Sequence, residues 1–417
     1  MATWSLRGAF SSVWSRFRGP RQINGRESSG TRSAITVTPE TALQVTSILC
    51  GARVIAEGVA QVPLKLFEEQ DDENNRTIRK PARDHDVYNL IAYQPNDWMT
   101  SFEFRETLTL HAVLGGGGFA FINRASSGRA RELIPIAPDD IKVIVDADRS
   151  IRYEIVIEAG RFTRVDLDQI LHIKGPSWNG AVGLNIVSLA REAIGLSVAL
   201  ERSQADLFGK GARPSGVLST ETPIGPEAVD KMRARWTERF GPGGDGGVAL
   251  LDGNWKFESV NMTGVDSQQL ESRRFQIEEN CRAIRVFPQM VMQSDKASTF
   301  ASAGAFFQAH VVHTIMPWTE RWEGALKRDL IGWDGDNANI WPRFLLEGLM
   351  EGDPKARGEF YTKMVNMGAM SPNEVRAAEN RNPRDGGDEF LSPMNMRLGN
   401  GQGDDDPAPR QEDDDAA

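Results

Sequence analysis

The chain has 417 residues, 40% of them hydrophobic, so it can hold two or three domains with cores of their own, and a small disulfide-stapled fold is excluded. Its two cysteines, Cys50 and Cys281, fall in helical apolar patterns and are expected to be reduced core residues. The net charge of −10 has the wrong sign for a conventional nucleic-acid binder, and no apolar window reaches the length of a membrane span.

The N-terminal segment 1–32 is basic and aromatic. It holds six Arg and one Glu, and Trp4, Phe10, Trp14 and Phe17 recur at roughly helical spacing. This composition is typical of an organelle transit peptide, of a membrane-surface helix, of a basic arm that docks on a neighbouring protein or on DNA, or of plain disorder. We interpret it as a flexible basic arm.

The stretch 38–208 predicts a mixture of helices and strands. Thr38 before Pro39 marks a helix start, and apolar residues at helical spacing continue to about residue 58. Thr100 and Glu103 form a capping box for a second helix. Alternation of apolar residues predicts strands at VPLKLFEE, FAFINR, ELIPIA, IKVIVD, IRYEIVIE, RFTRVD and QILHIKG, and a further helix covers roughly 183–208.

Two helices separated by a Gly-rich insertion dominate the segment 226–302. The first is PEAVDKMRARWTERF at 226–240, and the insertion 241–265 holds two short strand-like pieces. The second begins at Asp266, carries a narrow apolar stripe and ends before Pro288. The polar residues from there to about Ser302 predict a mobile loop.

Further helices fill the C-terminal part. A long helix is expected from near Ala303, and Pro317 should bend it because proline lacks a backbone donor. Another helix opens at Pro354 and closes at Gly368, and a capping box at Ser371 opens the next. The tail from about residue 393 is rich in Gly, Asp and Pro and is expected to be disordered.

No pattern in the sequence requires an enzyme. The glycines at 115–118 are not followed by Lys-Ser or Lys-Thr, so a tight helix-to-strand turn explains them better than a phosphate-binding loop. His310 and His313 lie three residues apart on a helix but have no third ligand, which favours core or interface histidines over a metal site. The other histidines have no recognisable nucleophile partner. We expect no cofactor and no metal.

The order of DSQQLESRRFQIEENCR, a break at Pro288, a polar loop and MPWTERWEGAL resembles the portal proteins of tailed double-stranded DNA bacteriophages, among them those of gene transfer agents. The segments VTPETALQVTSILCGARVIAEGVAQVPLKLF, LIAYQPNDWMTSFEF and DQILHIKGPSWNGAVGLNIVSL also follow the order and spacing of that family. The resemblance covers about residues 34–390. The chain departs from the family at residues 285–288, where a Gly-Val-Pro turn is more usual.

The resemblance implies an α+β portal fold with wing, stem, clip, tunnel loop and crown, in a subunit that forms rings. On this sequence it assigns 1–32 to the basic arm, 33–224 to the wing, 225–240 and 266–285 to the stem helices, 241–265 to the clip, 286–302 to the tunnel loop, 303–350 to the long wing helix and the segment after it, 351–392 to the helical crown, and 393–417 to a disordered acidic tail.

The resemblance also implies a function. A dodecameric ring at one capsid vertex would pass DNA inward during packaging and outward during ejection. Its partners would be the terminase large subunit, the head-tail adaptor and the major capsid protein, with no membrane. The protein would reside in the virion after synthesis in the bacterial cytoplasm. Residues 33–403 carry −9, because 1–32 carries +5 and 404–415 carries −6. A ring of such acidic chains would repel the DNA backbone and let it slide.

The resemblance places particular residues at the channel and at the docking surface. Those expected at the channel are Gln293, Ser294, Asp295 and Lys296 in the tunnel loop and Arg233, Arg235, Arg273 and Arg274 on the stem. Those expected to dock the motor and the adaptor are Asp245, Asp252, Asn254 and Trp255 in the clip. The alternative is a ring-forming membrane pore or secretion component, which the polar, Gly-rich insertion disfavours.

Overall fold

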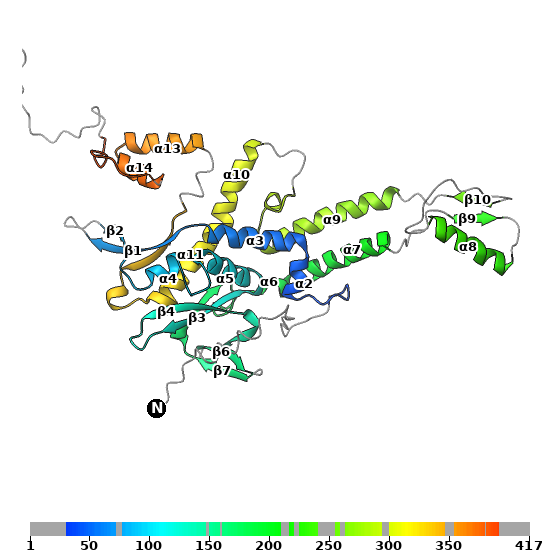
Figure 1. The fold of residues 1–417 in the computed structure, drawn as a ribbon, viewed down its shortest axis with the longest axis horizontal. Coiled ribbons are helices and arrows are strands. Elements are labelled where there is room, and N and C mark those ends of the chain that lie inside the picture. The colour runs from blue at the N-terminus through cyan, green and yellow to red at the C-terminus, as the bar shows by residue number, and fades with distance from the viewer. Residues whose placement is uncertain are drawn as a thin grey trace, which may run out of the picture. The chain divides into compact units, whose positions relative to one another are not determined.

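Two helices, α3 (Thr46–Ala60) and α5 (Ser101–Gly115), pack against each other at the centre of the larger of two units (Figure 1). The computed structural model describes residues 31–71, 77–146, 150–158, 161–209, 217–220, 225–240, 255–258, 263–293, 300–346, 354–379 and 381–391. The chain divides into the units Met1–Leu346 and Glu347–Ala417. The mixture of helices and antiparallel sheets confirms the expected α+β class.

Both central helices arise from local signals that the sequence carries. Thr38 caps the short helix α2 (Pro39–Gln44), and the extended backbone of Val45 separates α2 from α3. Thr100 and Glu103 form the predicted capping box of α5. Ile48, Ile55 and Leu108 are fully buried, so the apolar faces of α3 and α5 supply the centre of this core.

Two three-stranded antiparallel sheets pack face to face beside these helices. The first has the order β4-β3-β8 and the second the order β5-β6-β7. Their shared core includes Phe119 and Phe121 from the first sheet and Tyr153 and Ile155 from the second. The strands are β3 (Gly117–Arg124), β4 (Ala130–Ile136), β5 (Ile141–Val145), β6 (Ile151–Glu158), β7 (Arg161–Val165) and β8 (Ile170–Lys174), as the alternating patterns predicted.

The glycine run forms the predicted turn between α5 and β3. Gly116 ends the helix with φ of 87°, a conformation that glycine adopts without strain. A Cβ on Gly118 would lie 2.2 Å from the backbone oxygen of Leu108, and a Cβ on Gly183 would lie 1.9 Å from the backbone oxygen of Gly116. The run is therefore needed for close backbone packing.

A long helical segment then crosses the unit. It consists of α10 (Phe300–His310), a π-helical turn (Val311–Ile315), α11 (Met316–Ala325) and a second π-helical turn (Leu326–Ile331). Pro317 is the second residue of α11, just after the first π-helical turn. Proline has no backbone N–H, and here that donor is missing where the α-helical hydrogen-bond pattern is already interrupted. The helix therefore accommodates the proline that the sequence placed inside it.

A buried lysine holds the turn after this segment. The Lys327 ammonium donates to the backbone oxygens of Asn337, Ala338 and Ile340 at 2.6, 3.2 and 2.7 Å. It also lies 5.4 and 4.8 Å from the ring centroids of Trp333 and Trp341. The lysine thus fixes the entry to β11 (Ile340–Phe344), which pairs with β1 (Leu64–Asp71) in a sheet of order β11-β1-β2.

The remaining elements of the larger unit are short or peripheral. The strand β9 (Val217–Thr220) pairs with β10 (Trp255–Glu258) in an antiparallel ribbon. Of these two strands, β10 belongs to the Gly-rich insertion 241–265, and β9 precedes that insertion in the chain. The other elements are β2 (Thr77–Pro81), α4 (Tyr88–Ala92), α6 (Ile186–Leu189), α7 (Arg191–Gly209), α8 (Pro226–Phe240), α9 (Thr263–Ile284) and 3-10 turns at Pro138–Asp140, Leu167–Gln169, Pro288–Val291 and Gly335–Asn337. None of the described helices is both long and apolar enough to cross a membrane.

The smaller unit contains α13 (Pro354–Asn366) and α14 (Pro372–Ala378). Gly368, with φ of 69°, follows α13, and Ser371 with Glu374 forms the predicted capping box of α14. The side chain of Asn373 contacts the segment after α14, donating to the Arg384 oxygen and to Asp388, both at 2.9 Å. These contacts join the C-terminal segment to the helix start.

Candidate functional site

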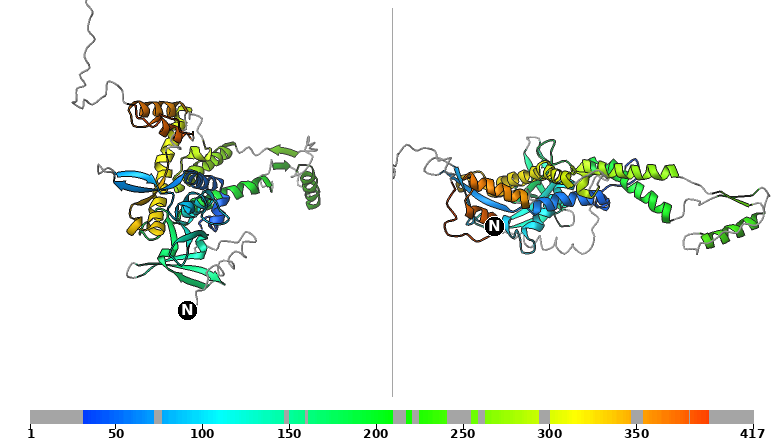
Figure 2. Two further views of the ribbon diagram at one scale, coloured as in Figure 1. Left: turned by 60° about the vertical axis from the view of Figure 1, so that its left-hand side comes forward. Right: turned by 90° about the horizontal axis from the view of Figure 1, so that it is seen from above.

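The helix α9 lies beside α7 (Figures 1 and 2). Arg273 on α9 donates to the side chain of Gln204 on α7 at 2.6 Å, and the side-chain amide of Gln276 donates to the Ala193 oxygen at 2.9 Å. The sequence had grouped α9 with the helix 226–240 as the stem pair. In the structure α9 contacts α7, and polar groups on these two helices pair with each other.

A buried amide sets the register of three helices. Asn280 on α9 is 1% exposed, and its Nδ2 donates to the hydroxyls of Ser47 on α3 and Ser197 on α7, both at 3.0 Å. A buried polar group is costly unless it is paired, so sliding α9 along its neighbours would lose both bonds. Asn280 therefore specifies how α3, α7 and α9 meet.

Two glycines on α3 let residues on either side of the expected tunnel loop, 286–302, pack closely against that helix. A Cβ on Gly51 would lie 2.1 Å from the Ile284 side chain at the end of α9, and a Cβ on Gly58 would lie 2.6 Å from that of Ile315. The Thr314 hydroxyl also donates to the Arg285 oxygen at 3.0 Å. The two ends of the segment 285–314 are thus fixed on one helix and to each other.

The backbone turns sharply at the start of this segment. Arg285 and Met292 have φ of 59° and 62°, a region that residues other than glycine seldom occupy. The side chain of Met292 is 91% exposed. Backbone strain of this kind persists only where surrounding contacts impose it, so the packing of Ile284 and Ile315 on α3 determines where the loop begins.

The predicted channel residues occupy several elements. Arg273 and Arg274 are exposed on α9, and Arg233 and Arg235 are exposed on α8. Gln293 is at the end of the described turn, where its backbone N–H donates to the Pro288 oxygen at 3.0 Å. Three tunnel-loop residues and three clip residues lie outside the described residues: Ser294, Asp295, Lys296, Asp245, Asp252 and Asn254. The remaining clip residue, Trp255, opens β10 opposite Thr220.

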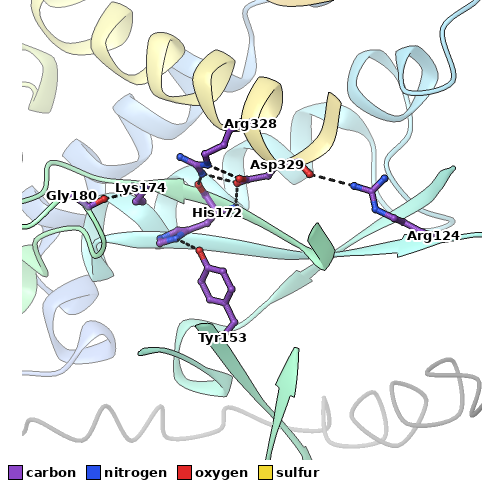
Figure 3. A network of polar contacts seen from close by, with 7 residues as sticks. All are labelled: Arg124, Tyr153, His172, Lys174, Gly180, Arg328 and Asp329. Carbon is purple, nitrogen blue, oxygen red and sulfur yellow. Dashed lines mark hydrogen bonds and ion pairs between the residues drawn. The ribbon is translucent and has the colours of Figure 1, made fainter. Parts of the chain in front are cut away.

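A polar network that the sequence did not indicate joins the second π-helical turn to the edge strand β8 (Figure 3). Asp329 accepts from the His172 backbone N–H at 2.9 Å, and Arg328 donates to the His172 backbone oxygen at 3.0 Å. The side chains of Asp329 and Arg328 thus hydrogen-bond to the backbone N–H and oxygen of His172 on the edge of β8, as a further strand would do. Arg124 donates to the Asp329 backbone oxygen at 3.3 Å and extends the contact to β3.

The His172 side chain is buried among aromatic rings. It stacks on Phe119 with ring centroids 4.3 Å apart, and its Nδ1 lies 2.9 Å from the Tyr153 hydroxyl. Burial lowers the pKa of His172 to about 3, helped by the positive charges of Lys174 and Arg328. Burial likewise raises the pKa of Tyr153 to about 12. Both side chains are therefore neutral near pH 7, which suits a buried structural contact between the two sheets.

No metal site is formed in the part of the chain that the structure describes. There, no group of three or more His, Cys, Asp or Glu side chains is placed to hold an ion. His310 is buried, and burial lowers its pKa, whereas His313 is exposed. The two rings therefore lie in different environments.

The sequence carried weak signals for the residues that it did not single out. A Lys within an otherwise apolar helical stripe, as at Lys327, is a signal of a buried and paired charge. Asn280 lies on the apolar stripe of α9 next to Cys281, which also marks it as unusual. The pairing of His172 with Asp329 has no such signal, because 157 residues separate them.

The comparisons with known proteins agree with this architecture. The family described as phage portal protein matches residues 47–380. The chain is 28% identical over 360 residues to the portal protein of Enterobacteria phage HK97, covering 85% of this chain and 82% of that protein. It is 29% identical over 383 residues to the probable portal protein of Streptomyces phage phiC31, covering 87% and 81%.

Solved structures show the same fold. A chain from the virion of a native gene transfer agent particle is similar with a TM-score of 0.60 and 22% identity, over 91% of this chain and 100% of that one. A portal protein of the HK97 family from Corynebacterium diphtheriae is similar with a TM-score of 0.51 and 15% identity, over 77% and 100%. With the family match spanning most of its length, this chain belongs to the phage portal protein family.

Proposed function

We propose that this chain assembles into a twelve-subunit ring at one capsid vertex, through which double-stranded DNA is packaged and later ejected. A similar chain occurs in the neck of a native gene transfer agent particle, in a structure computed with C12 symmetry, with a TM-score of 0.59. In this proposal the protein is a virion component made in the cytoplasm of a bacterial host. The proposal covers an infectious phage and a gene transfer agent alike.

The observation that carries the proposal is apolar surface on the helices around the expected tunnel loop. Phe275 on α9 is 57% exposed, and Phe307, Val312 and Met316 along the long helical segment are 39%, 40% and 37% exposed. Exposed large apolar side chains on α9 and on the long helical segment are candidates for contact with another subunit. A ring covers such a surface, because each subunit presents one side to each of two neighbours.

The charge of the chain supports a role as a conduit. The net charge of the chain is −10. On α9, Arg282 forms ion pairs with Glu278 at 3.0 Å and with Glu279. Paired arginines have less positive charge to offer to phosphates. We therefore assign weak, exchangeable DNA contacts to Lys296 and its neighbours in the tunnel loop and to Arg273 and Arg274.

The partners in this proposal are the terminase large subunit, the head-tail adaptor and the major capsid protein. The segment 241–265, with Asp245, Asp252, Asn254 and Trp255, is the proposed docking surface for the motor and the adaptor. The work of the ring is mechanical, and the energy for DNA movement comes from ATP hydrolysis by the terminase. We propose no catalytic residue in this chain.

Electron microscopy of the purified protein tests the ring. We expect twelvefold rings with a central hole for the wild type and folded monomers for the variant Phe275→Asp combined with Phe307→Asp, because two buried carboxylates would oppose subunit contact. Circular dichroism and light scattering distinguish a folded monomer from an unfolded chain. Compact monomers in the wild-type sample would contradict the proposal.

A charge reversal tests the tunnel loop. The change Lys296→Glu replaces one cation per subunit by an anion facing a duplex that carries a charge every ~1.7 Å of its axis. We expect assembled rings and a yield of DNA-filled particles reduced several-fold, measured by DNA content per particle. The matched control is Lys80→Glu on the exposed strand β2, which should fill normally. Equal filling of both variants would remove Lys296 from the proposed DNA contacts.

A further inference from the structure

Two exposed leucines lie on the successive helices α6 and α7. Leu189 is 66% exposed and Leu196 is 46% exposed, with the exposed Glu192 between them. Leu189 is the last residue of α6 and Ala190 separates it from α7, in which Glu192 and Leu196 lie four residues apart on one face. We call this surface, defined by Leu189, Glu192 and Leu196, the α6–α7 strip.

The N-terminal part of the chain is fixed directly beside the strip. Thr31 is 8% exposed, and its Cγ2 lies 2.8 Å from the position that a Cβ on Gly195 would take. The Arg32 backbone N–H donates to the Glu192 carboxylate at 3.2 Å. The Thr31 hydroxyl also donates to the Ile35 oxygen at 2.9 Å, which closes a tight turn. The described part of the chain therefore begins beside Glu192, and residues 1–30 are covalently joined to it there.

The composition of that tethered segment complements the strip. Residues 1–30 contain five Arg and one Glu, and their aromatic residues are Trp4, Phe10, Trp14 and Phe17. The 14 residues from Phe17 to Thr31 span at most ~48 Å when extended, and a tether of this kind gives an effective concentration in the millimolar range. Aromatic rings can cover the exposed leucines while arginines lie near Glu192.

We propose that residues 1–20 bind the α6–α7 strip of their own chain. The segment then acts as an arm that covers apolar surface on α6 and α7, with Thr31 in the Gly195 notch as its fixed point. This inference rests on the exposure of the strip and the path of residues 31–35. It does not depend on ring formation, so its failure would leave the proposed ring untouched.

Cleavage by trypsin measures whether the arm is bound. The full-length wild type is compared with the double variant Leu189→Gln, Leu196→Gln, and mass spectrometry follows cutting after Arg7, Arg16 and Arg18. We expect these sites to be cut at least fivefold faster in the double variant, because the arm loses its apolar partners. The matched control is Leu167→Gln, at a leucine that is 55% exposed elsewhere in the unit, and it should behave as the wild type.

A competitor peptide adds a second readout that does not depend on the variants. A synthetic peptide of residues 1–20, added at several millimolar without protease, should occupy the strip and release the resident arm, which a fluorophore attached to the arm reports as faster rotational motion. Equal arm cleavage in wild type and double variant would overturn the proposal. The proposal would also be overturned if only a short DNA duplex slowed cleavage of the arm, and did so in both proteins. The partner of the arm would then be nucleic acid.

Discussion

Replacing Lys327 by Met is expected to lower the free energy of unfolding of the larger unit by about 2–4 kcal/mol. The ammonium group donates to three backbone oxygens at 2.6–3.2 Å, and the residue is 1% exposed. Met fills a similar volume but donates no hydrogen bond, so the oxygens of Asn337, Ala338 and Ile340 would lose their donor. Burial lowers the pKa of Lys327, because taking the ammonium group out of water disfavours its charged form.

Urea unfolding followed by tryptophan fluorescence measures the change. Two tryptophans, Trp333 and Trp341, flank the ammonium group, so the signal includes the region that the variant disturbs. Hydrogen exchange of the amides at 332–341 then localises the loss, and we expect faster exchange there. Lys231→Met, at an exposed lysine on α8, is the matched control and should unfold with the wild type. A Lys327→Met protein with wild-type stability would mean that water replaces the ammonium group.

Acid is expected to destabilise the fold through His172. Burial lowers the pKa of this group to about 3, whereas an unfolded histidine titrates near its ordinary value of 6.5. The unfolded state therefore binds more protons between these values, so the stabilising contribution is complete above pH 6.5 and is lost as the pH falls toward 3. For this one group the loss at pH 4 amounts to about 3 kcal/mol.

The variant His172→Asn tests this assignment because it removes the titration and keeps an acceptor near the Tyr153 hydroxyl. We expect the variant to be less stable than the wild type at pH 7 and to lose less stability between pH 7 and pH 4. Stability is measured by urea unfolding at each pH, with His313→Asn at an exposed position as the control. Parallel curves for His172→Asn and the wild type would show that other groups cause the acid sensitivity.

Much of the fold could be predicted because its signals are local. The helix starts at Thr38, Thr100 and Ser371 satisfy backbone donors within three residues, and the structure confirms all three. Alternation of apolar residues located the six strands of the two packed sheets, since a half-buried strand needs one apolar face. The turn at Gly116 was predictable for the same reason, because its positive φ is a property of one residue.

The candidate site was less predictable because its geometry depends on distant pairs. The packing of α9 depends on Asn280 and Gln276, which bond to residues of α7 that lie 83 positions away in the chain. The network around His172 depends on Asp329 across 157 residues, and no spacing rule connects them. The π-helical turns and the β9–β10 ribbon also went unpredicted, since each results from packing against neighbours.

The sequence by itself determined the positions of most helices and strands, the acidic balance of the chain and its resemblance to phage portal proteins. These properties follow from neighbouring residues and from the order of motifs along the chain. The tertiary structure alone decided that α7 pairs with α9, that Lys327 and His172 are buried, and that Thr31 lies against Gly195. These contacts join residues that are far apart in the chain. They stabilise the protein only after folding has brought those residues together and excluded water from around them.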